Sequence, residues 1–182
     1  MAILTLIEQQ QLKPISPNWA NQRVEGLGIT NFDQLAQEVE DSDLQTLLGV
    51  ALLQDVQDNP TEARNVTLLD GGSFEDCNGN TIKFKGLKYI LAYMNYSQYV
   101  AEGYAADTFS GFVKASRPDS EHLNSTERKE IKSNVRGKAM VQWDIIKQFL
   151  NKNSDTYTLW YCAQSKKPYR PRMYGVRKTI RR

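Results

Sequence analysis

Two helical patterns, separated by a long polar segment, constrain the fold of this chain most strongly. Residues 124–151 repeat apolar side chains at spacings of three and four, which is the period of an amphipathic helix. These positions are Ile131, Val135, Ala139, Trp143, Ile146 and Leu150. Residues 86–102 repeat the pattern at Leu87, Ile90, Leu91, Met94 and Ala101. The sequence therefore predicts a mainly α fold, a helical bundle framed by two long helices.

The later of these helices carries a start signal and one weak point. Asn124, with Glu127 three residues on, resembles a capping box in which Asn replaces the usual Ser or Thr. Gly137 lies in the middle of the helix, where glycine costs about 1 kcal/mol relative to alanine. We therefore expect Gly137 to mark a close packing contact between helices.

The first third of the chain is predicted to be helical as well. Pro17 suits the first turn of a short helix. Residues 31–59 then repeat apolar side chains at helical spacing. Asp41 and Ser42 are residues that cap helices, so a break into two helices at that point stays open.

Glycines and β-favouring residues predict a small hairpin unit over residues 66–85. Strands 73–77 and 81–85 would flank the Asn-Gly pair at 78–79, which tolerates the positive φ of a tight turn. An isolated hairpin is marginal in water, so this one must pack on a helix or on a neighbouring chain. Residues 155–164 alternate large and small side chains, which predicts a further short extended piece.

A second face of the 86–102 helix is rich in tyrosine. Its members are Tyr89, Tyr93, Tyr96, Val100 and Tyr104. One interpretation is a central core helix whose tyrosine hydroxyls reach the surface. The other is that part of this face meets another subunit, because tyrosine combines a large apolar area with a polar end.

Length and composition fit one domain over residues 1–165. The 182 residues are 40% apolar, which is enough to build a single core. No run of about 18 apolar residues exists, and the first residues lack the basic start and long apolar centre of a signal peptide. We therefore expect a protein made and used without crossing a membrane. Cys77 and Cys162 lack the spacing of a disulfide framework or a zinc site, so we expect free thiols.

Charge is divided unevenly along the chain. The formal net charge is +2, but residues 166–182 hold eight of the 23 Lys and Arg and no acidic residue. The rest of the chain has 15 basic against 21 acidic residues. Pro168 and Pro171 oppose a regular helix, so this C-terminal arm is predicted to be extended. Three interpretations of the arm stay open: docking on an acidic protein surface, contact with nucleic acid, or a disordered solubilising end.

Residues with catalytic or metal-binding chemistry are sparse. The single histidine, His122, lies beside Asp119 and Glu121 in a polar segment, which is more typical of a solvated loop than of a metal site or general base. The sequence has no glycine-rich phosphate loop, no paired cysteine ligands and no nucleophile motif. We therefore expect no enzymatic activity, no metal and no cofactor.

Three motifs lie around the segment that joins the two long helices. Gly86, Leu87 and Lys88 precede the tyrosine-rich helix, Thr108, Gly111 and Val113 follow it, and Trp143 lies in the late helix. In these motifs the chain resembles the head-to-tail connector proteins of crass-like and related Bacteroidetes bacteriophages, which form rings beneath the portal. The resemblance covers residues 68–150.

The resemblance implies a mostly helical, structural virion protein in a cyclic ring matched to a twelvefold portal. Such a ring would join capsid to tail in the neck of the virion and surround the DNA exit channel. Assembly would take place in the host cytoplasm. The implied partners are further copies of the chain, the portal protein and neighbouring neck or tail rings, with non-specific contact to packaged DNA.

The resemblance also explains the polar segment, since loops beyond about 12–15 residues are usually functional or disordered. Residues 107–123 would be an inter-helix loop that becomes ordered at a subunit interface, with the 166–182 arm as a second joint. The expected interface residues are Thr108, Phe109, Gly111, Phe112, Val113, Arg117, Tyr169, Arg170, Arg172 and Tyr174. The residues expected near DNA are Arg177, Lys178, Arg181 and Arg182.

A rival hypothesis from a different class is a small nucleic-acid-binding protein that acts through its basic arm. Binding to duplex DNA with a steep salt dependence, lost on deletion of residues 166–182, would favour this hypothesis.

Overall fold

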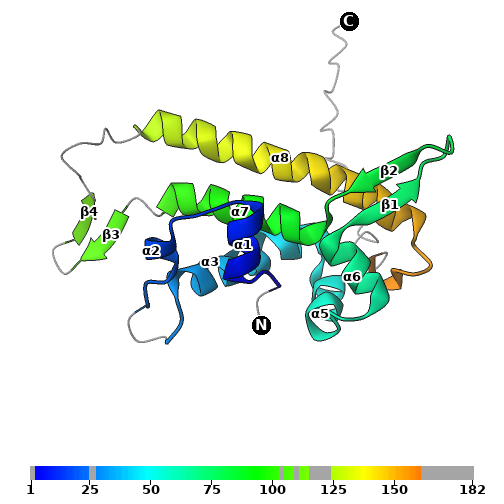
Figure 1. The fold of residues 1–182 in the computed structure, drawn as a ribbon, viewed down its shortest axis with the longest axis horizontal. Coiled ribbons are helices and arrows are strands. Elements are labelled where there is room, and N and C mark those ends of the chain that lie inside the picture. The colour runs from blue at the N-terminus through cyan, green and yellow to red at the C-terminus, as the bar shows by residue number, and fades with distance from the viewer. Residues whose placement is uncertain (1–2, 25–27, 103–104, 109–110, 115–123, 161–182) are drawn as a thin grey trace, which may run out of the picture.

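The computed structural model describes residues 3–24, 28–102, 105–108, 111–114 and 124–160. Two long helices, α7 (Gly86–Glu102) and α8 (Ser125–Lys152), run in opposite directions side by side along the longest axis (Figure 1). The other helical elements are α1 (Leu6–Leu12), α2 (Pro17–Ala20), α3 (Asn31–Val39), the π-helix η1 (Glu40–Leu44), α4 (Gln45–Leu48), α5 (Val50–Asp58) and α6 (Ala63–Asp70). The strands are β1 (Gly72–Glu75), β2 (Thr81–Phe84), β3 (Ala105–Thr108) and β4 (Gly111–Lys114). The predicted mainly α fold with a small hairpin is confirmed.

The predicted frame of two long helices is confirmed, although Ala101, predicted on the apolar face, is exposed and Ile131 is only half-buried. Helix α8 begins with the expected capping box: the Glu127 N–H donates to Asn124 Oδ1 at 2.8 Å, and Glu127 Oε2 accepts from the Asn124 N–H at 2.8 Å. The buried side chains include the predicted apolar positions Leu87, Ile90, Leu91, Met94, Val135, Ala139, Trp143, Ile146 and Leu150. The short helix α2 begins at Pro17, as predicted.

The helical stretch from residue 31 is interrupted eight residues later than Asp41, the position left open in the sequence. Asp41 and Ser42 lie inside the π-helix η1, and the break comes at Gly49, where φ is +81°. This backbone conformation is unfavourable for any residue with a Cβ, so glycine lets the chain turn between α4 and α5. Glu40 and Leu44, at the two ends of η1, are both buried.

The N-terminal helix α1 was not predicted, although its start signal is present in the sequence. Thr5 and Glu8 form a capping box, with the Glu8 N–H donating to Thr5 Oγ1 at 3.3 Å. The fully buried Gln9 donates to the backbone oxygen of Ala92 at 3.0 Å and accepts from Asn95 Nδ2 at 3.2 Å. These bonds attach α1 to the middle of α7.

Glu40 fixes the beginning of the chain to the body. The Ile3 N–H donates to Glu40 Oε1 at 2.7 Å, and Gln57 Nε2 donates to Glu40 Oε2 at 3.0 Å. Burial raises the pKa of the Glu40 carboxyl above its ordinary value, because the charged form loses its hydration.

The predicted hairpin unit over residues 66–85 is wrong in its first part, where the chain forms helix α6. Leu68 and Leu69 are buried on this helix, so packing against α7 outweighs the β preference of the Val-Thr pair before them. Helix α6 crosses the start of α7 closely: a Cβ added to Gly86, at φ +67°, would lie 2.3 Å from the Leu69 backbone oxygen. Gly86, one of the glycines that suggested turns in the sequence, therefore permits the close crossing of the α6 and α7 backbones.

The hairpin itself is confirmed, with shorter strands and a wider loop than expected. Strand β1 pairs antiparallel with β2, and Phe74 lies opposite Ile82. The connection spans residues 76–80, and only Gly79 in it has a positive φ. The Asp76 side chain organises this loop by accepting from the Asn80 N–H at 2.8 Å. The Asp76 carboxylate holds the loop by accepting from the Asn78 and Asn80 N–H groups, and the φ of Asn78 is not positive.

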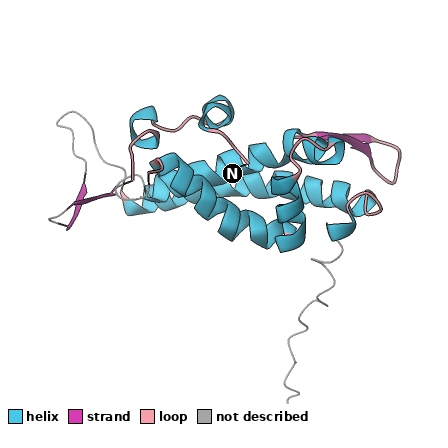
Figure 2. Cartoon of the chain, turned by 90° about the horizontal axis from the view of Figure 1, so that it is seen from below, coloured by secondary structure: helices cyan, strands magenta, loops and turns pink. Residues whose placement is uncertain are grey.

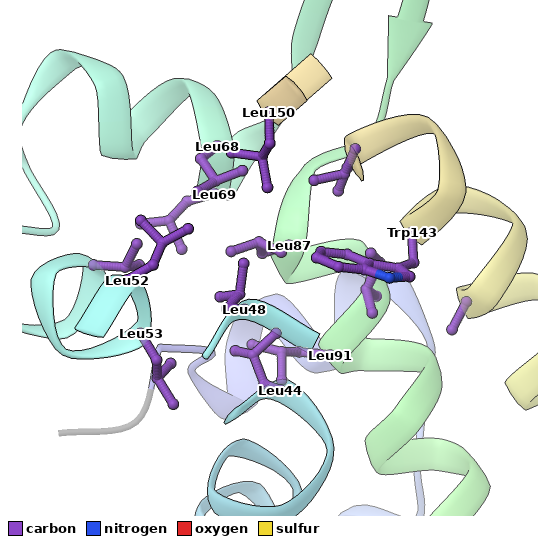
Figure 3. Packing of buried hydrophobic residues seen from close by; sticks show 14 of the residues in the cluster. Leu44, Leu48, Leu52, Leu53, Leu68, Leu69, Leu87, Leu91, Trp143 and Leu150 are labelled. Atoms are coloured by element: carbon purple, nitrogen blue, oxygen red, sulfur yellow. The ribbon is translucent and has the colours of Figure 1, made fainter. Parts of the chain in front are cut away.

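In the core, leucines of the short helices pack against the facing sides of α7 and α8. Figure 3 shows Leu44, Leu48, Leu52, Leu53, Leu68, Leu69, Leu87, Leu91, Trp143 and Leu150 converging from five helices and η1. Three aromatic rings extend this core to the hairpin. Phe84 lies 4.6 Å from Phe149 between ring centroids, and Phe74 lies 5.8 Å from Phe149. The hairpin β1–β2 therefore rests on the last turns of α8.

The extended piece predicted over residues 155–164 is wrong where the structure describes it. Residues 158–160 are helical, and residues 161–164 lie outside the described part. Tyr157 and Trp160 are buried, and their separation of three residues is a helical spacing and not an alternation.

Gly137 does not mark the close helix contact expected from the sequence. It is exposed on α8, and a Cβ added there would meet nothing within 4 Å in the described part of the chain. We therefore predict that Gly137→Ala raises the free energy of unfolding of the isolated chain by about 1 kcal/mol, through helix propensity alone. Urea unfolding followed by circular dichroism measures this change.

Gly86→Ala is the matched control, because the same added methyl group meets backbone atoms at a positive φ. It should lower the free energy of unfolding by more than about 1 kcal/mol. Equal effects of the two substitutions would contradict this account of the two glycines.

Candidate assembly surfaces

The segment predicted as a long interface loop contains a second β-hairpin. Strand β3 pairs antiparallel with β4, so Thr108 lies opposite Gly111 and Ala106 lies opposite Val113. The inter-helix loop predicted over residues 107–123 therefore contains strand residues at 107–108 and 111–114. Of the predicted interface residues in this segment, Thr108, Gly111, Phe112 and Val113 lie on the strands. Phe109 and Arg117 lie outside the described residues.

This hairpin, which we call the distal ribbon (residues 105–108 and 111–114), lies beyond the ends of the helices that flank it. Figure 1 shows β3 and β4 past the last turn of α7 and the first turn of α8, at one end of the longest axis. Within the described chain, these strands form a sheet of their own with two members. An isolated two-stranded ribbon is only marginally stable in water, so we expect the distal ribbon to be stabilised by a partner.

A hydrogen bond and an ion pair hold the ends of α7 and α8 that flank the distal ribbon in the sequence. Ser97 Oγ on α7 donates to the backbone oxygen of Lys132 on α8 at 3.2 Å. One turn further, Arg136 makes a two-pronged ion pair with Asp43 of η1, with nitrogen-to-oxygen distances of 2.6 and 2.8 Å. Paired parallel bonds of this kind fix orientation as well as distance. The last turns of α7 and the first turns of α8, which flank the ribbon in the sequence, are therefore held together.

The hairpin β1–β2, which we call the proximal ribbon (residues 72–84), lies at the opposite end of the molecule. Figure 2 shows the two magenta strand pairs at the two ends of the helical body. One face of the proximal ribbon is anchored by Phe74 and Phe84, while Ser73 and Lys83 on the other face are exposed. The chain thus carries one short two-stranded sheet at each end of a helical rod.

The outer edges of the proximal ribbon can be assigned from its hydrogen-bond pattern. The Asp76 N–H donates to the Asn80 oxygen at 2.8 Å, and bonded and non-bonded pairs alternate along an antiparallel ladder. The pairs Glu75↔Thr81 and Ser73↔Lys83 are therefore non-bonded pairs, whose N–H and C=O groups point outward. On β1, the Glu75 oxygen accepts from Lys152 Nζ. On β2, the backbone groups of Thr81 and Lys83 bond to no other described element.

The predicted tyrosine face of α7 forms a half-buried aromatic stripe. The rings of Tyr89 and Tyr93 stack at 4.4 Å between centroids, and Lys85 lies 4.5 Å from the Tyr89 ring. Lys13 lies over the next ring, 4.3 Å from the centroid of Tyr96. Each cation faces an aromatic ring at a distance typical of cation–π attraction.

The N-terminal segment covers the far end of this stripe. Tyr99 lies 6.0 Å from Tyr96 and 4.9 Å from Trp19 of α2, so the stripe continues onto another helix. The sequence interpretation named Tyr96 and Val100 but missed Tyr99 and Trp19. Their contact depends on how the first 30 residues fold back, which no local pattern reveals. The part nearest Tyr89 and Tyr93 stays half-exposed. Partial burial raises the pKa of the Tyr89 hydroxyl to about 12, with a further contribution from the hydrogen-bonded Tyr93.

The root of the C-terminal arm is anchored by buried aromatic residues. Tyr157 Oη donates to the backbone oxygen of Arg64 at 2.6 Å, and Trp160 Nε1 donates to Asn151 Oδ1 at 2.8 Å. Trp160 also meets Trp143 edge to face at 5.8 Å. These contacts fix Trp160, the last residue that the structure describes before the arm.

The predicted arm residues and the lone histidine fall outside the described part of the chain. This applies to Tyr169, Arg170, Arg172, Tyr174, Arg177, Lys178, Arg181 and Arg182, and to His122 and Cys162. Cys77 is exposed in the loop of the proximal ribbon as a free thiol. Within residues 3–24, 28–102, 105–108, 111–114 and 124–160, no group of three or more His, Cys, Asp or Glu residues is arranged to hold a metal ion. In the same residues, no helix has the length and apolar character needed to cross a membrane.

A family model described as "Family of unknown function (DUF6712)" matches residues 44–170. The chain belongs to this family. The DUF6712 region begins at the end of η1 and includes α7, α8 and both ribbons, while α1, α2 and α3 precede it. No curated protein and no solved structure matches the chain. The family assignment therefore groups the ribbons and long helices together without assigning them an activity.

The two ribbons should contribute very differently to the stability of the isolated chain. Replacing residues 105–114 by a glycine-serine linker of the same length should change the free energy of unfolding by less than about 1 kcal/mol, because the distal ribbon forms no sheet with the body. Phe84→Ala should lower it by about 3–5 kcal/mol, because this buried ring packs on Phe149. Urea unfolding of both variants measures the contrast. A large loss of stability in the linker variant would contradict a distal ribbon independent of the body.

Proposed function

We propose that this protein is a structural component of a bacteriophage virion, a subunit of a ring beneath the portal that joins capsid to tail. In this proposal the chain is not an enzyme and needs no cofactor. Its role is geometric: a rigid helical body spaces the ring, and projecting segments join it to its neighbours.

The observation that carries the proposal is the rod with a short two-stranded ribbon at each end (Figure 1). Open ribbon edges are an aggregation hazard that monomeric proteins usually cover. A subunit that carries one such edge at each end is suited to joining neighbours in series. Head-to-tail contacts of this kind join two different faces and close into a ring where the rotation between neighbours completes a circle.

The proposed location in a phage neck comes from the resemblance to phage connector proteins. Most residues of the motifs that carry this resemblance lie at positions constrained by close packing, burial or ion pairs. Gly86 permits the close crossing of α6 over α7, and Leu87 is fully buried. Lys88 Nζ joins three helices through Glu8 at 2.7 Å and Asp70 at 2.8 Å. Trp143 packs on Trp160 at the root of the arm. The first and last motifs therefore have roles in the body, and the middle one, Thr108, Gly111 and Val113, lies on the distal ribbon.

The half-exposed part of the tyrosine stripe and the basic arm are the further contact surfaces of the proposal. Tyr89 and Tyr93 offer apolar rings with polar ends, which is a composition enriched at protein interfaces. Residues 166–182 would dock on the portal, on a neighbouring copy or on the next ring, with the last arginines close to packaged DNA. Binding of nucleic acid by the arm alone is the rival function.

The experiment that tests this proposal is imaging of intact virions by cryo-electron microscopy, with the chain traced into the density of the neck. We expect a ring of copies directly beneath the portal. Pull-down of portal protein by the tagged full-length chain from infected cells gives a second measurement, and we expect the portal to co-purify.

Absence of the chain from purified virions would contradict the proposal. Binding of the isolated chain to duplex DNA that falls steeply with salt, is lost on deletion of residues 166–182 and occurs without portal co-purification would favour the rival instead.

A further inference from the structure

We propose that the distal ribbon of one copy pairs edge to edge with the proximal ribbon of the next copy, with β3 lying alongside β2. The result is a four-stranded sheet shared between two chains. This inference deepens the proposed function and rests on it for its setting in a ring, because it names the joint between subunits. Its chemistry depends only on the two ribbons.

The position of the ribbons makes this contact a head-to-tail one. They lie at opposite ends of the longest axis (Figures 1 and 2), so a single chain cannot pair its own distal ribbon with its own proximal ribbon. Two copies placed end to end bring the two edges together and leave one free ribbon at each outer end. The contact therefore propagates and ends only when the series closes on itself.

The available backbone groups select β2 as the receiving edge. The outward groups of Thr81 and Lys83 bond to no other described element, whereas the Glu75 oxygen on the β1 edge accepts from Lys152. An added strand beside β2 would satisfy N–H and C=O groups that otherwise bond only to water. It would also raise both sheets from two strands to four, beyond the marginal two-stranded state.

Charge selects β3 as the strand that pairs with β2. Strand β2 carries one charged residue, Lys83, and β3 carries one, Asp107. In β1 and β4 the charged residues are Glu75 and Lys114, so β2 against β4 would oppose two lysines. Opposite charges across strands stabilise pairing, and like charges oppose it.

The same complementarity favours a second copy of this chain over an unrelated partner. Each ribbon is a sheet of two strands in the described chain, and the strands proposed to meet carry opposite charges in the sequence, Lys83 on β2 and Asp107 on β3. Both strand pairs are four residues long, so their ladders match in length.

The test is a charge exchange between the two strands, followed by sedimentation velocity of the full-length protein over a range of concentrations. Lys83→Glu and Asp107→Lys, each alone, should raise the dissociation constant between copies about fivefold by creating a like-charge pair. The double variant restores opposite charges, so we expect its dissociation constant to return within about twofold of the wild-type value. A role of either residue within its own ribbon would not produce this rescue.

Lys138→Glu is the matched control for Lys83→Glu, because it makes the same change in net charge at an exposed position of α8 away from both ribbons. We expect it to leave the dissociation constant unchanged. Single variants without effect, a double variant as weak as the singles, or a wild-type chain that stays monomeric at all concentrations would each overturn the proposal.

Cross-linking identifies which strands meet. In a background with Cys77→Ser and Cys162→Ser, Lys83→Cys and Ala105→Cys are made as separate proteins, mixed and treated with a short bismaleimide. Position 105 lies two residues before Asp107, so the two share one face of the strand. We expect heterodimers in the mixture and little product from either protein alone. Dimers of the Ala105→Cys protein alone would instead show distal ribbons pairing with each other, and would overturn the inference. Cross-links between purified chains that are absent from virions would refute the proposed function and leave this pairing intact.

Discussion

The antiparallel contact between α7 and α8 is the interaction on which the rest of the structure depends. The two helices bury a continuous row of apolar side chains against each other and against the leucines of the short helices. Their length sets the longest dimension of the molecule, and their ends determine where the chain must turn. The proximal ribbon leads into α7, and the distal ribbon joins α7 to α8. A ribbon at each end is therefore a direct consequence of this helix pair.

The ribbons differ in what holds them. Phe74 and Phe84 attach the proximal ribbon to Phe149, so the body stabilises one of its faces and leaves its β2 edge open. The distal ribbon forms its own two-stranded sheet beyond the helices. Isolated ribbons of this size gain stability only through added strands or a packed face. In our proposal, a neighbouring copy supplies the added strands, and the anchored ribbon acts as the template.

Much of the helical frame could be predicted from the sequence, because burial on one face imposes a period that is visible locally. The position of α7 follows from this period, and the start of α8 follows from the separate capping signal of Asn124 and Glu127. Helix α6 was missed because Val66 and Thr67 favour strands, and the preference was overridden by burial of Leu68 and Leu69 against α7. Gly137 was misread because a glycine in a helix signals packing only if something approaches it.

The candidate surfaces were less predictable than the frame. The segment after α7 was recognised as unusual by its length, but its pairing as β3 and β4 was not, since strands of four residues have weak local signals. The tyrosine stripe was found where it follows the helix period and missed where it passes to Trp19. Contacts between segments distant in sequence carry no periodic signal.

The measurement that tests the central claim most directly is hydrogen exchange of the ribbon amides in the free and the assembled protein. If the ribbon edges are satisfied only on another copy, the amides of Thr81, Lys83 and one edge of residues 105–108 exchange rapidly in the monomer. On assembly, their exchange should slow by at least about tenfold, while the core of α7 and α8 changes little. Equal exchange of these amides in both states would contradict the account.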